Sequence, residues 1–417
     1  MKNLLYVYKC MGIILQNEWR NRSIFAAIIL MLISLFISRA FLSVSLFLFL
    51  AVTIIGRDIF SQFARFFRSP LLVGMSFLFF IPLISGLWSS NVQAWISVSR
   101  IKLPFLLLPL AFAGNWQLQE KQWKIIANIF LLLVTMGCCW SLWQYFQNME
   151  VINRDYLRAQ TLPAPLGNDH VRFSWLVSIA VACGILLICT TRNKVTKSLI
   201  ALSLLLWVVY LHILSARTGL VLTYFFFLCF ALYLARQRKR FFFIILAALV
   251  VIPLASWWLF PSLQNRVKYI VYDFSFLKSN KDLPGTSDAN RLISLKAGWY
   301  ILRENPLGAG AGDIRDEMNK WYAVHVPGIG EADKLFPSSE WVVYGDIAGW
   351  PGIFLFTVIM IVPLFVKRIR HRFFWIMLGV MGVGSSLVET TLEIQFGIFI
   401  YCFTILWWWK WFKLQKE

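Results

Sequence analysis

The sequence predicts an all-α protein that crosses a membrane many times. Of its 417 residues, 59% are hydrophobic and only 14% are charged, whereas about a quarter of the residues in a soluble domain are charged. The apolar residues form continuous runs and do not alternate with polar ones, which excludes a membrane β-barrel. One long interval, 261–350, is too polar to lie in a bilayer.

Apolar runs of spanning length predict about twelve transmembrane helices, since one span needs roughly 20 residues. They lie near 23–38, 40–55, 70–88, 97–113, 123–146, 171–190, 197–214, 218–235, 241–260, 341–366, 373–388 and 392–412. The first two are short and alternatively form one re-entrant pair. The chain thus divides into an N-terminal transmembrane bundle over 1–260, with about nine spans, a loop domain over 261–340 and C-terminal spans over 341–417.

Basic clusters precede the first predicted span and follow every even-numbered one. The positive-inside rule then predicts that both termini are cytoplasmic and that the 261–340 loop is extracytoplasmic. The net charge of +20 follows from these clusters, so we expect no nucleic-acid partner. All seven cysteines except Cys10 lie in apolar runs, which predicts neither a disulfide framework nor a metal site. No cleavable signal peptide is expected from residues 1–22.

Several basic residues fall on the predicted outer side, against the rule. These are Arg39, Arg100, Lys102, Arg154, Arg158, Arg172, Arg217, Arg291 and Arg303. Either each pairs with a local acid or a lipid headgroup, or several converge on an anionic ligand, which the planar guanidinium binds well. Arg217 is the sharpest case, because it lies in a tight turn between two spans with no acid beside it; snorkelling to headgroups is the alternative.

Inside the long loop, 287–290 is typical of a helix start and 291–304 of an amphipathic helix that ends at Asn305 and Pro306. Arg291 would then lie in the first helical turn, where backbone N–H groups favour an anion. The glycine-rich run 308–312 predicts a flexible or close-packed turn, and 313–322 a second short helix. Residues 338–340 are typical of an N-cap, and 349–352 predict a kink or a late start of the tenth span.

Two further groups of polar residues lie next to predicted spans. His170 and Arg172 stand at the outer mouth of the sixth span. Glu389 and Glu393 lie one helical turn apart, and we place them near the cytoplasmic boundary between or within the last two spans. They serve either in ion pairs with arginines, the structural interpretation that we favour, or in a proton path.

The order of these motifs resembles that of the O-antigen ligase and O-antigen polymerase superfamily. The matching segments are Ser-Ala-Arg-Thr-Gly-Leu at 215–220, Asn290-Arg291, Asn-Pro-Leu-Gly-Ala-Gly at 305–310, Pro-Ser-Ser-Glu-Trp at 337–341 and Gly-Trp-Pro-Gly-Ile at 349–353. The resemblance covers roughly 215–356 and the layout of about twelve spans. Each motif is loose by itself, and their order and spacing carry the likeness.

This resemblance implies an inverting glycosyltransferase of the bacterial inner membrane that uses no metal, nucleotide or other cofactor. Its donor would be a glycan on undecaprenyl pyrophosphate. A ligase transfers the glycan to lipid A-core, our first choice, and a polymerase to another lipid-linked repeat. Family arginines that grip the pyrophosphate match Arg217 and Arg291. Our candidate substrate-binding residues are His170, Arg172, Arg303, Ser338 and Ser339, and membrane lipids complete the expected partners.

The chain departs from the family pattern in the loop before the tenth span, where a histidine is usual. Here the matching segment is 337–340, and a serine is no general base at neutral pH. Either Glu340, Asp346 or His325 takes over, with Glu340 our choice and His325 the second catalytic candidate, or positioning alone suffices, or the chain is inactive. A transporter of an anionic lipid or solute and a non-catalytic membrane scaffold are the alternatives from other classes.

Overall fold

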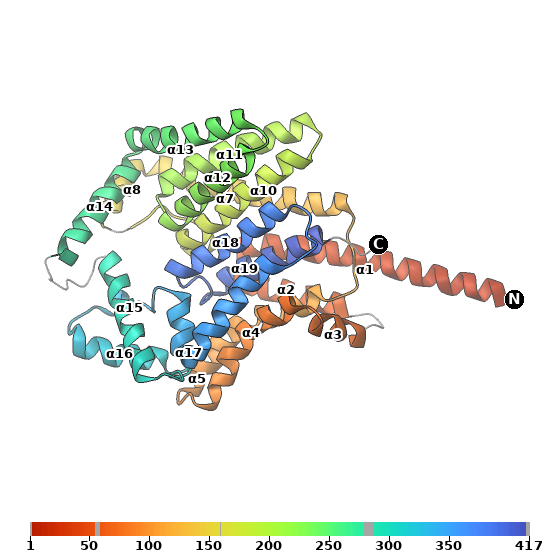
Figure 1. Cartoon of the computed structure of the whole chain (residues 1–417), viewed down its shortest axis with the longest axis horizontal. Coiled ribbons are helices and arrows are strands. Elements are labelled where there is room, and N and C mark those ends of the chain that lie inside the picture. The colour runs from red at the N-terminus through yellow and green to blue at the C-terminus, as the bar shows by residue number, and fades with distance from the viewer. Residues whose placement is uncertain (1, 55–58, 159, 279–286, 414–417) are drawn as a thin grey trace.

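The computed structural model describes residues 2–54, 59–158, 160–278 and 287–413. Within these ranges the chain is almost entirely helical, and the sole β pairing is an isolated bridge between Ile369 and Lys413. Nine of the described helices are long and apolar enough to cross a membrane. The predicted class, an all-α multi-pass membrane protein, is therefore confirmed (Figure 1).

The described residues form nineteen α-helices. They are α1 (Lys2–Ile37), α2 (Arg39–Ile54), α3 (Ile59–Phe67), α4 (Pro70–Ile84), α5 (Val92–Lys102), α6 (Pro104–Phe112), α7 (Glu120–Gln147), α8 (Met149–Asp155), α9 (Pro165–Asn168), α10 (His170–Thr190), α11 (Lys194–Leu214), α12 (Arg217–Ala235), α13 (Lys239–Leu259), α14 (Pro261–Lys278), α15 (Ser287–Glu304), α16 (Ile314–His325), α17 (Glu340–Ile361), α18 (Arg372–Val388) and α19 (Gln395–Phe412).

Every predicted span coincides with a helix, although the count of twelve membrane crossings stays a prediction. The helices that meet the length and apolarity criteria include the C-terminal part of α1 (Glu18–Ile37), α4, the α5–α6 pair, α7, α10 to α13 and α17. Helix α2 passes only together with α3, as a bent pair, and α18 is shorter than a full span. Helix α10 is the central element, since 78% of its apolar window is buried, compared with 6% for α13.

The described part of the interval 261–340 contains the α-helices α14, α15 and α16 and a close-packed glycine-rich turn at 308–312. Helix α15 begins at Ser287 and ends at Glu304, and α16 covers Ile314–His325, so both predicted loop helices are confirmed. The glycine-rich run packs tightly against the α4–α5 connection, because a Cβ on Gly310 would lie 2.4 Å from Ser89 Oγ. Asp313 follows it and accepts hydrogen bonds from the backbone N–H groups of Ser90 and Asn91, at 2.7 Å each.

Helix α17 is kinked where the sequence predicts a kink or a late start. Ala348 and Gly349 have non-helical backbone angles, and Gly349 has φ 66° and ψ −156°. The Trp350 N–H donates to the Pro306 carbonyl across the kink, at 3.0 Å. A Cβ at Gly349 would lie 1.9 Å from the same carbonyl oxygen. The segment after α15 is therefore fixed against the middle of α17, and α15 lies beside α17 at one side of the molecule (Figure 1).

Candidate functional site

The turn that carries Arg217 is fixed by hydrogen bonds on its inner side. Ser215 ends α11 in the left-handed conformation, with φ 51°, and its hydroxyl donates to the His212 carbonyl at 2.8 Å. The buried Tyr156 hydroxyl lies 3.0 Å from the carbonyl oxygens of Ile213 and Leu214 and binds the last turn of α11. Arg217 is the first residue of α12, so this turn fixes the position of its backbone.

Arg217 pairs with an acid that is distant in sequence. Its Nη2 lies 2.8 Å from the Asp288 carboxylate in the first turn of α15. Asp288 in turn donates its backbone N–H to Asp273 of α14, at 2.7 Å. The ion pair therefore joins α12 to the start of α15, while the Arg217 side chain keeps 38% of its surface exposed.

Arg291, one turn further along α15, pairs with Glu389. Its Nη2 lies 2.7 Å from Glu389 Oε1, at the point where α18 ends. Burial raises the pKa of Glu389, and the positive charges of Arg291 and Arg172 oppose that shift. We placed Glu389 and Glu393 near the cytoplasmic boundary, which disagrees with our own assignment of the basic cluster at 367–372 to that side. Helix α18 begins at that basic cluster, and both acids follow its opposite end, on the side of Arg291.

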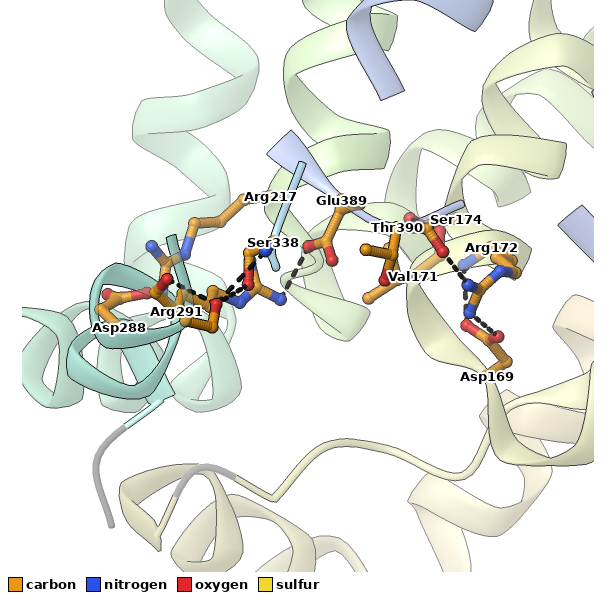
Figure 2. A network of polar contacts seen from close by, with 11 residues as sticks. Asp169, Val171, Arg172, Ser174, Arg217, Asp288, Arg291, Ser338, Glu389 and Thr390 are labelled. Carbon is orange, nitrogen blue, oxygen red and sulfur yellow. Dashed lines mark hydrogen bonds and ion pairs between the residues drawn. The ribbon is translucent and has the colours of Figure 1, made fainter. Parts of the chain in front are cut away.

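Both arginines contribute to one small pocket. Its lining includes Thr161, His170, Val171, the turn 215–218, Arg266, Arg291 and Glu389. The polar contacts around it lie in a row in Figure 2, with Asp288, Arg217, Arg291 and Glu389 following one another. The two arginines therefore have separate carboxylate partners and yet share a cavity.

Arg266 of α14 is the site residue that sequence reasoning missed. It is 8% exposed, and its Nε and Nη1 have no hydrogen-bond partner among the described residues. Its guanidinium lies 5.5 Å from the ring centroid of Tyr269. Burial, reinforced by the charge of Arg217, lowers the pKa of Arg266. The sequence contains one signal that could have identified Arg266: no acidic residue lies three or four positions from it, so it has no ion-pair partner on its own helix.

His170 and Arg172 take different positions at the start of α10. His170 lines the pocket, whereas Arg172 does not. The Arg172 guanidinium donates to Asp169 at 2.5 Å, to the Thr391 carbonyl at 3.1 Å and to the Thr390 carbonyl. Figure 2 shows Arg172 and Asp169 apart from the Arg217–Arg291 group, beyond Thr390. In this conformation Arg172 holds the α18–α19 connection against α10.

The segment before α17 reaches the site through Ser338. The Ser338 hydroxyl lies 2.9 Å from that of Ser294 on α15, and Figure 2 shows Ser338 beside Arg291. Ser339 is the N-cap residue of α17, as predicted, although its side chain makes no capping hydrogen bond.

Glu340 belongs to a second, separate polar cluster. It is fully buried, its Oε1 accepts the Leu392 N–H at 2.5 Å, and its Oε2 has no partner among the described residues. The buried Lys102 donates to Glu393 at 2.5 Å and lies 3.4 Å from the Tyr344 hydroxyl. Glu340 does not line the arginine pocket.

The remaining catalytic and binding candidates lie outside the pocket. His325 is exposed, stacks on Trp321 with ring centroids 4.5 Å apart and has Nδ1 3.0 Å from the Trp321 carbonyl. Arg303 lies over the ring of Trp299 at 5.8 Å. Asp346 is buried in α17 with both carboxylate oxygens unpartnered among the described residues.

The chemistry available at the pocket is that of anion binding. Among the described residues no group of three or more His, Cys, Asp or Glu side chains is arranged to hold a metal ion. Three guanidinium groups, from α12, α14 and α15, line this pocket and carry positive charge. In comparisons with known proteins, no family model matches the chain and no curated protein matches it.

Proposed function

We propose that the arginine pocket binds the diphosphate of a polyprenyl-linked glycan and that the protein transfers this glycan to an acceptor hydroxyl. The observation that carries the proposal is the convergence of Arg217, Arg266 and Arg291 from three helices on one pocket. Planar guanidinium groups bind phosphate oxygens in pairs. The order of the sequence motifs, which resembles that of the O-antigen ligases, is the reason that we prefer a ligase reaction.

The proposed reaction places the arginines at the leaving group. The acceptor oxygen attacks the anomeric carbon, the bond from that carbon to the diphosphate oxygen breaks, and the bonding electrons stay on the diphosphate. Preorganised cations in a partly dry site stabilise the charge that develops there. Asp288 and Glu389 would release Arg217 and Arg291 as the diphosphate enters, because they occupy the same guanidinium groups.

The acceptor proton needs a base within hydrogen-bonding reach. We assign this role to His170, since it lines the pocket, whereas Glu340 and His325 do not. Glu389 is the other group in the lining that can accept a proton once Arg291 has turned to the diphosphate. In this proposal the pocket faces the periplasm of a bacterial inner membrane and both termini are cytoplasmic.

The test is transfer by the purified chain from an undecaprenyl-diphosphate-linked glycan. Arg217→Ala and Arg291→Ala should each lower the rate by about 10²–10³, the usual cost of removing one preorganised donor. Arg303→Ala is the matched control, because Arg303 does not line the pocket. His170→Asn should lower transfer without weakening diphosphate binding. Transfer by both arginine variants at the rate of the unmodified protein contradicts the proposal.

The choice of acceptor separates the two enzymatic alternatives. Transfer to lipid A-core indicates a ligase, and transfer to a second lipid-linked repeat indicates a polymerase. A transporter would instead move an anionic substrate into proteoliposomes. That alternative loses support from the placement of Glu389 and Glu393, since both acids are held in ion pairs with Arg291 and Lys102. A scaffold would show neither activity.

A further inference from the structure

A second positively charged cavity lies at the other end of the bundle. It has a volume of about 580 Å³ and is lined by Arg65, Arg68, Lys367, Arg368, Lys410 and Lys413, with no carboxylate among the described lining residues. These cations come from three basic segments: the end of α3 and the residues just after it, the connection after α17, and the end of α19. Figure 1 shows α3 and the end of α19 on the opposite side of the molecule from α15 and α16.

Two of the six cations are held in place by the protein. Lys410 Nζ donates to the carbonyl oxygens of Phe112 and Gly114, at 3.2 and 2.9 Å, and lies 4.6 Å from the centroid of the Trp116 ring. Arg65 Nε donates to the Ala113 carbonyl at 2.9 Å. These contacts fix two cations in the lining of one cavity. Basic residues that only set the orientation of the chain in the membrane do not need to share a cavity.

Of the other four cations, Lys413 lies over the Trp409 ring, with Nζ 4.7 Å from its centroid, and the remaining three are available to a ligand. Arg68, Lys367 and Arg368 are exposed and form no ion pair with the described residues. Repulsion among like charges at one cavity falls when an anion binds between them. The volume also lies within the range of about 300–1,000 Å³ that is usual for small-molecule sites.

An apolar groove continues from this cavity along the side of the bundle. It also has a volume of about 580 Å³ and shares Ser69, Pro70, Val366, Lys367 and Trp409 with the basic cavity. Its remaining lining is apolar apart from the backbone, and consists of Leu71, Val358, Ile361, Val362 and Phe365. A cationic cavity that opens into an apolar groove matches one molecule with an anionic head and a hydrocarbon chain.

We propose that this surface binds an anionic phospholipid, with the phosphate headgroup in the basic cavity and an acyl chain in the groove. Basic pockets between transmembrane helices are suited to anionic headgroups. The groove favours a lipid over a soluble phosphate compound, because only a ligand with a hydrocarbon chain can bury apolar surface there. The lipid would join α4 to α17 and α19, and this proposal does not depend on the glycan-transfer proposal.

The test compares lipid binding by the purified full chain in detergent, measured by native mass spectrometry with a parallel titration. The probes are phosphatidylglycerol, phosphatidylcholine with the same acyl chains, and glycerol phosphate, which has the headgroup chemistry without chains. Phosphatidylglycerol should bind at least about tenfold more tightly than phosphatidylcholine. Glycerol phosphate should bind much more weakly than phosphatidylglycerol.

Two kinds of variant locate the site. The triple variant Arg68→Gln, Lys367→Gln, Arg368→Gln should lower phosphatidylglycerol affinity by at least about tenfold. The control Arg236→Gln, Lys239→Gln, Arg240→Gln removes the same charges from an exposed basic turn outside the cavity and should leave the affinity unchanged. Ile361→Trp fills the groove and should weaken phosphatidylglycerol without affecting glycerol phosphate.

Several outcomes would overturn the proposal. Equal retention of the two lipids, or equal losses in the cavity and control triple variants, would mean that the cavity has no anionic headgroup specificity. Glycerol phosphate that binds as tightly as phosphatidylglycerol would make the site one for a free anion. Each variant's melting temperature is measured first, and the charge variant, which changes only exposed side chains, still decides if Ile361→Trp fails to fold.

Discussion

Arg291 of α15 and Glu389, at the end of α18, form an ion pair of 2.7 Å between two segments that are far apart in the chain. Glu389 is also the carboxylate that lines the arginine pocket itself, whereas Asp288, the partner of Arg217, does not line it. A diphosphate that binds Arg291 must therefore compete with a carboxylate of the protein. This competition makes the pocket accessible to experiments that need no glycan substrate.

Removing the competing charge should strengthen anion binding. Glu389→Gln is expected to raise the affinity for farnesyl diphosphate by about tenfold, because a hydrogen bond to a charged group contributes about 1.5–3 kcal/mol and a tenfold change corresponds to about 1.4 kcal/mol. Isothermal titration calorimetry in detergent measures this affinity. Glu317→Gln is the control, since Glu317 pairs with Lys320 on α16. Unchanged or weaker binding by Glu389→Gln would count against the competition.

The same ion pair predicts a pH dependence. Burial raises the pKa of Glu389, with Arg291 and Arg172 opposing it and Asp169 adding to it. Falling pH therefore protonates Glu389 earlier than an ordinary glutamate and releases Arg291, so diphosphate affinity should rise towards acidic pH. For folding, a carboxyl group with a raised pKa favours the folded state at low pH, and this contribution is lost as the pH rises through that pKa.

The comparison with Glu389→Gln isolates this titration. Protonation of the ligand and of His170 affects both proteins alike, so the difference in affinity between them should shrink as the pH falls. A difference that stays constant across the pH series would show that Glu389 does not control access to Arg291.

Arg266→Gln should separate binding from stability. We expect a fall of about 10- to 100-fold in diphosphate affinity, from the loss of one charge-assisted hydrogen bond. The melting temperature should stay the same or rise, because the variant removes a buried charge with unpartnered nitrogens. Arg303→Gln is the control in both measurements. A lower melting temperature with unchanged affinity would make Arg266 a structural residue.

Lys102 and Glu393 should show strong coupling in unfolding experiments. The Lys102 side chain is fully buried and lies 2.5 Å from Glu393, so Lys102→Met leaves a carboxylate without its partner. The expected loss of stability is about 3–5 kcal/mol, the usual cost of breaking a buried pair. The double variant with Glu393→Gln should recover part of this loss. Additive losses would mean that the two groups do not interact.

The kink of α17 predicts a glycine that no other residue can replace. Gly349→Ala places a Cβ 1.9 Å from the Pro306 carbonyl oxygen at a positive φ, so the variant should fold poorly or melt much earlier. Gly328→Ala is the control, with φ +91° and nothing within 4 Å of the new Cβ. That control carries only backbone strain, about 1–3 kcal/mol. Equal effects of the two variants would show that the contact with Pro306 is dispensable.

The sequence by itself determined the membrane class, both ends of α15, the extent of α16 to within a few residues, the turn before Arg217 and the kink of α17. Each of these follows from hydropathy, helical periodicity or Gly and Pro chemistry within a few neighbouring positions.

Tertiary structure alone decided that Asp288 and Glu389 are the partners of Arg217 and Arg291, that Arg266 joins them, and that Glu340 faces Leu392 and not the pocket. These contacts connect helices that are distant along the chain. Their pairing depends on how whole helices pack, and no local pattern of residues encodes which side chains meet.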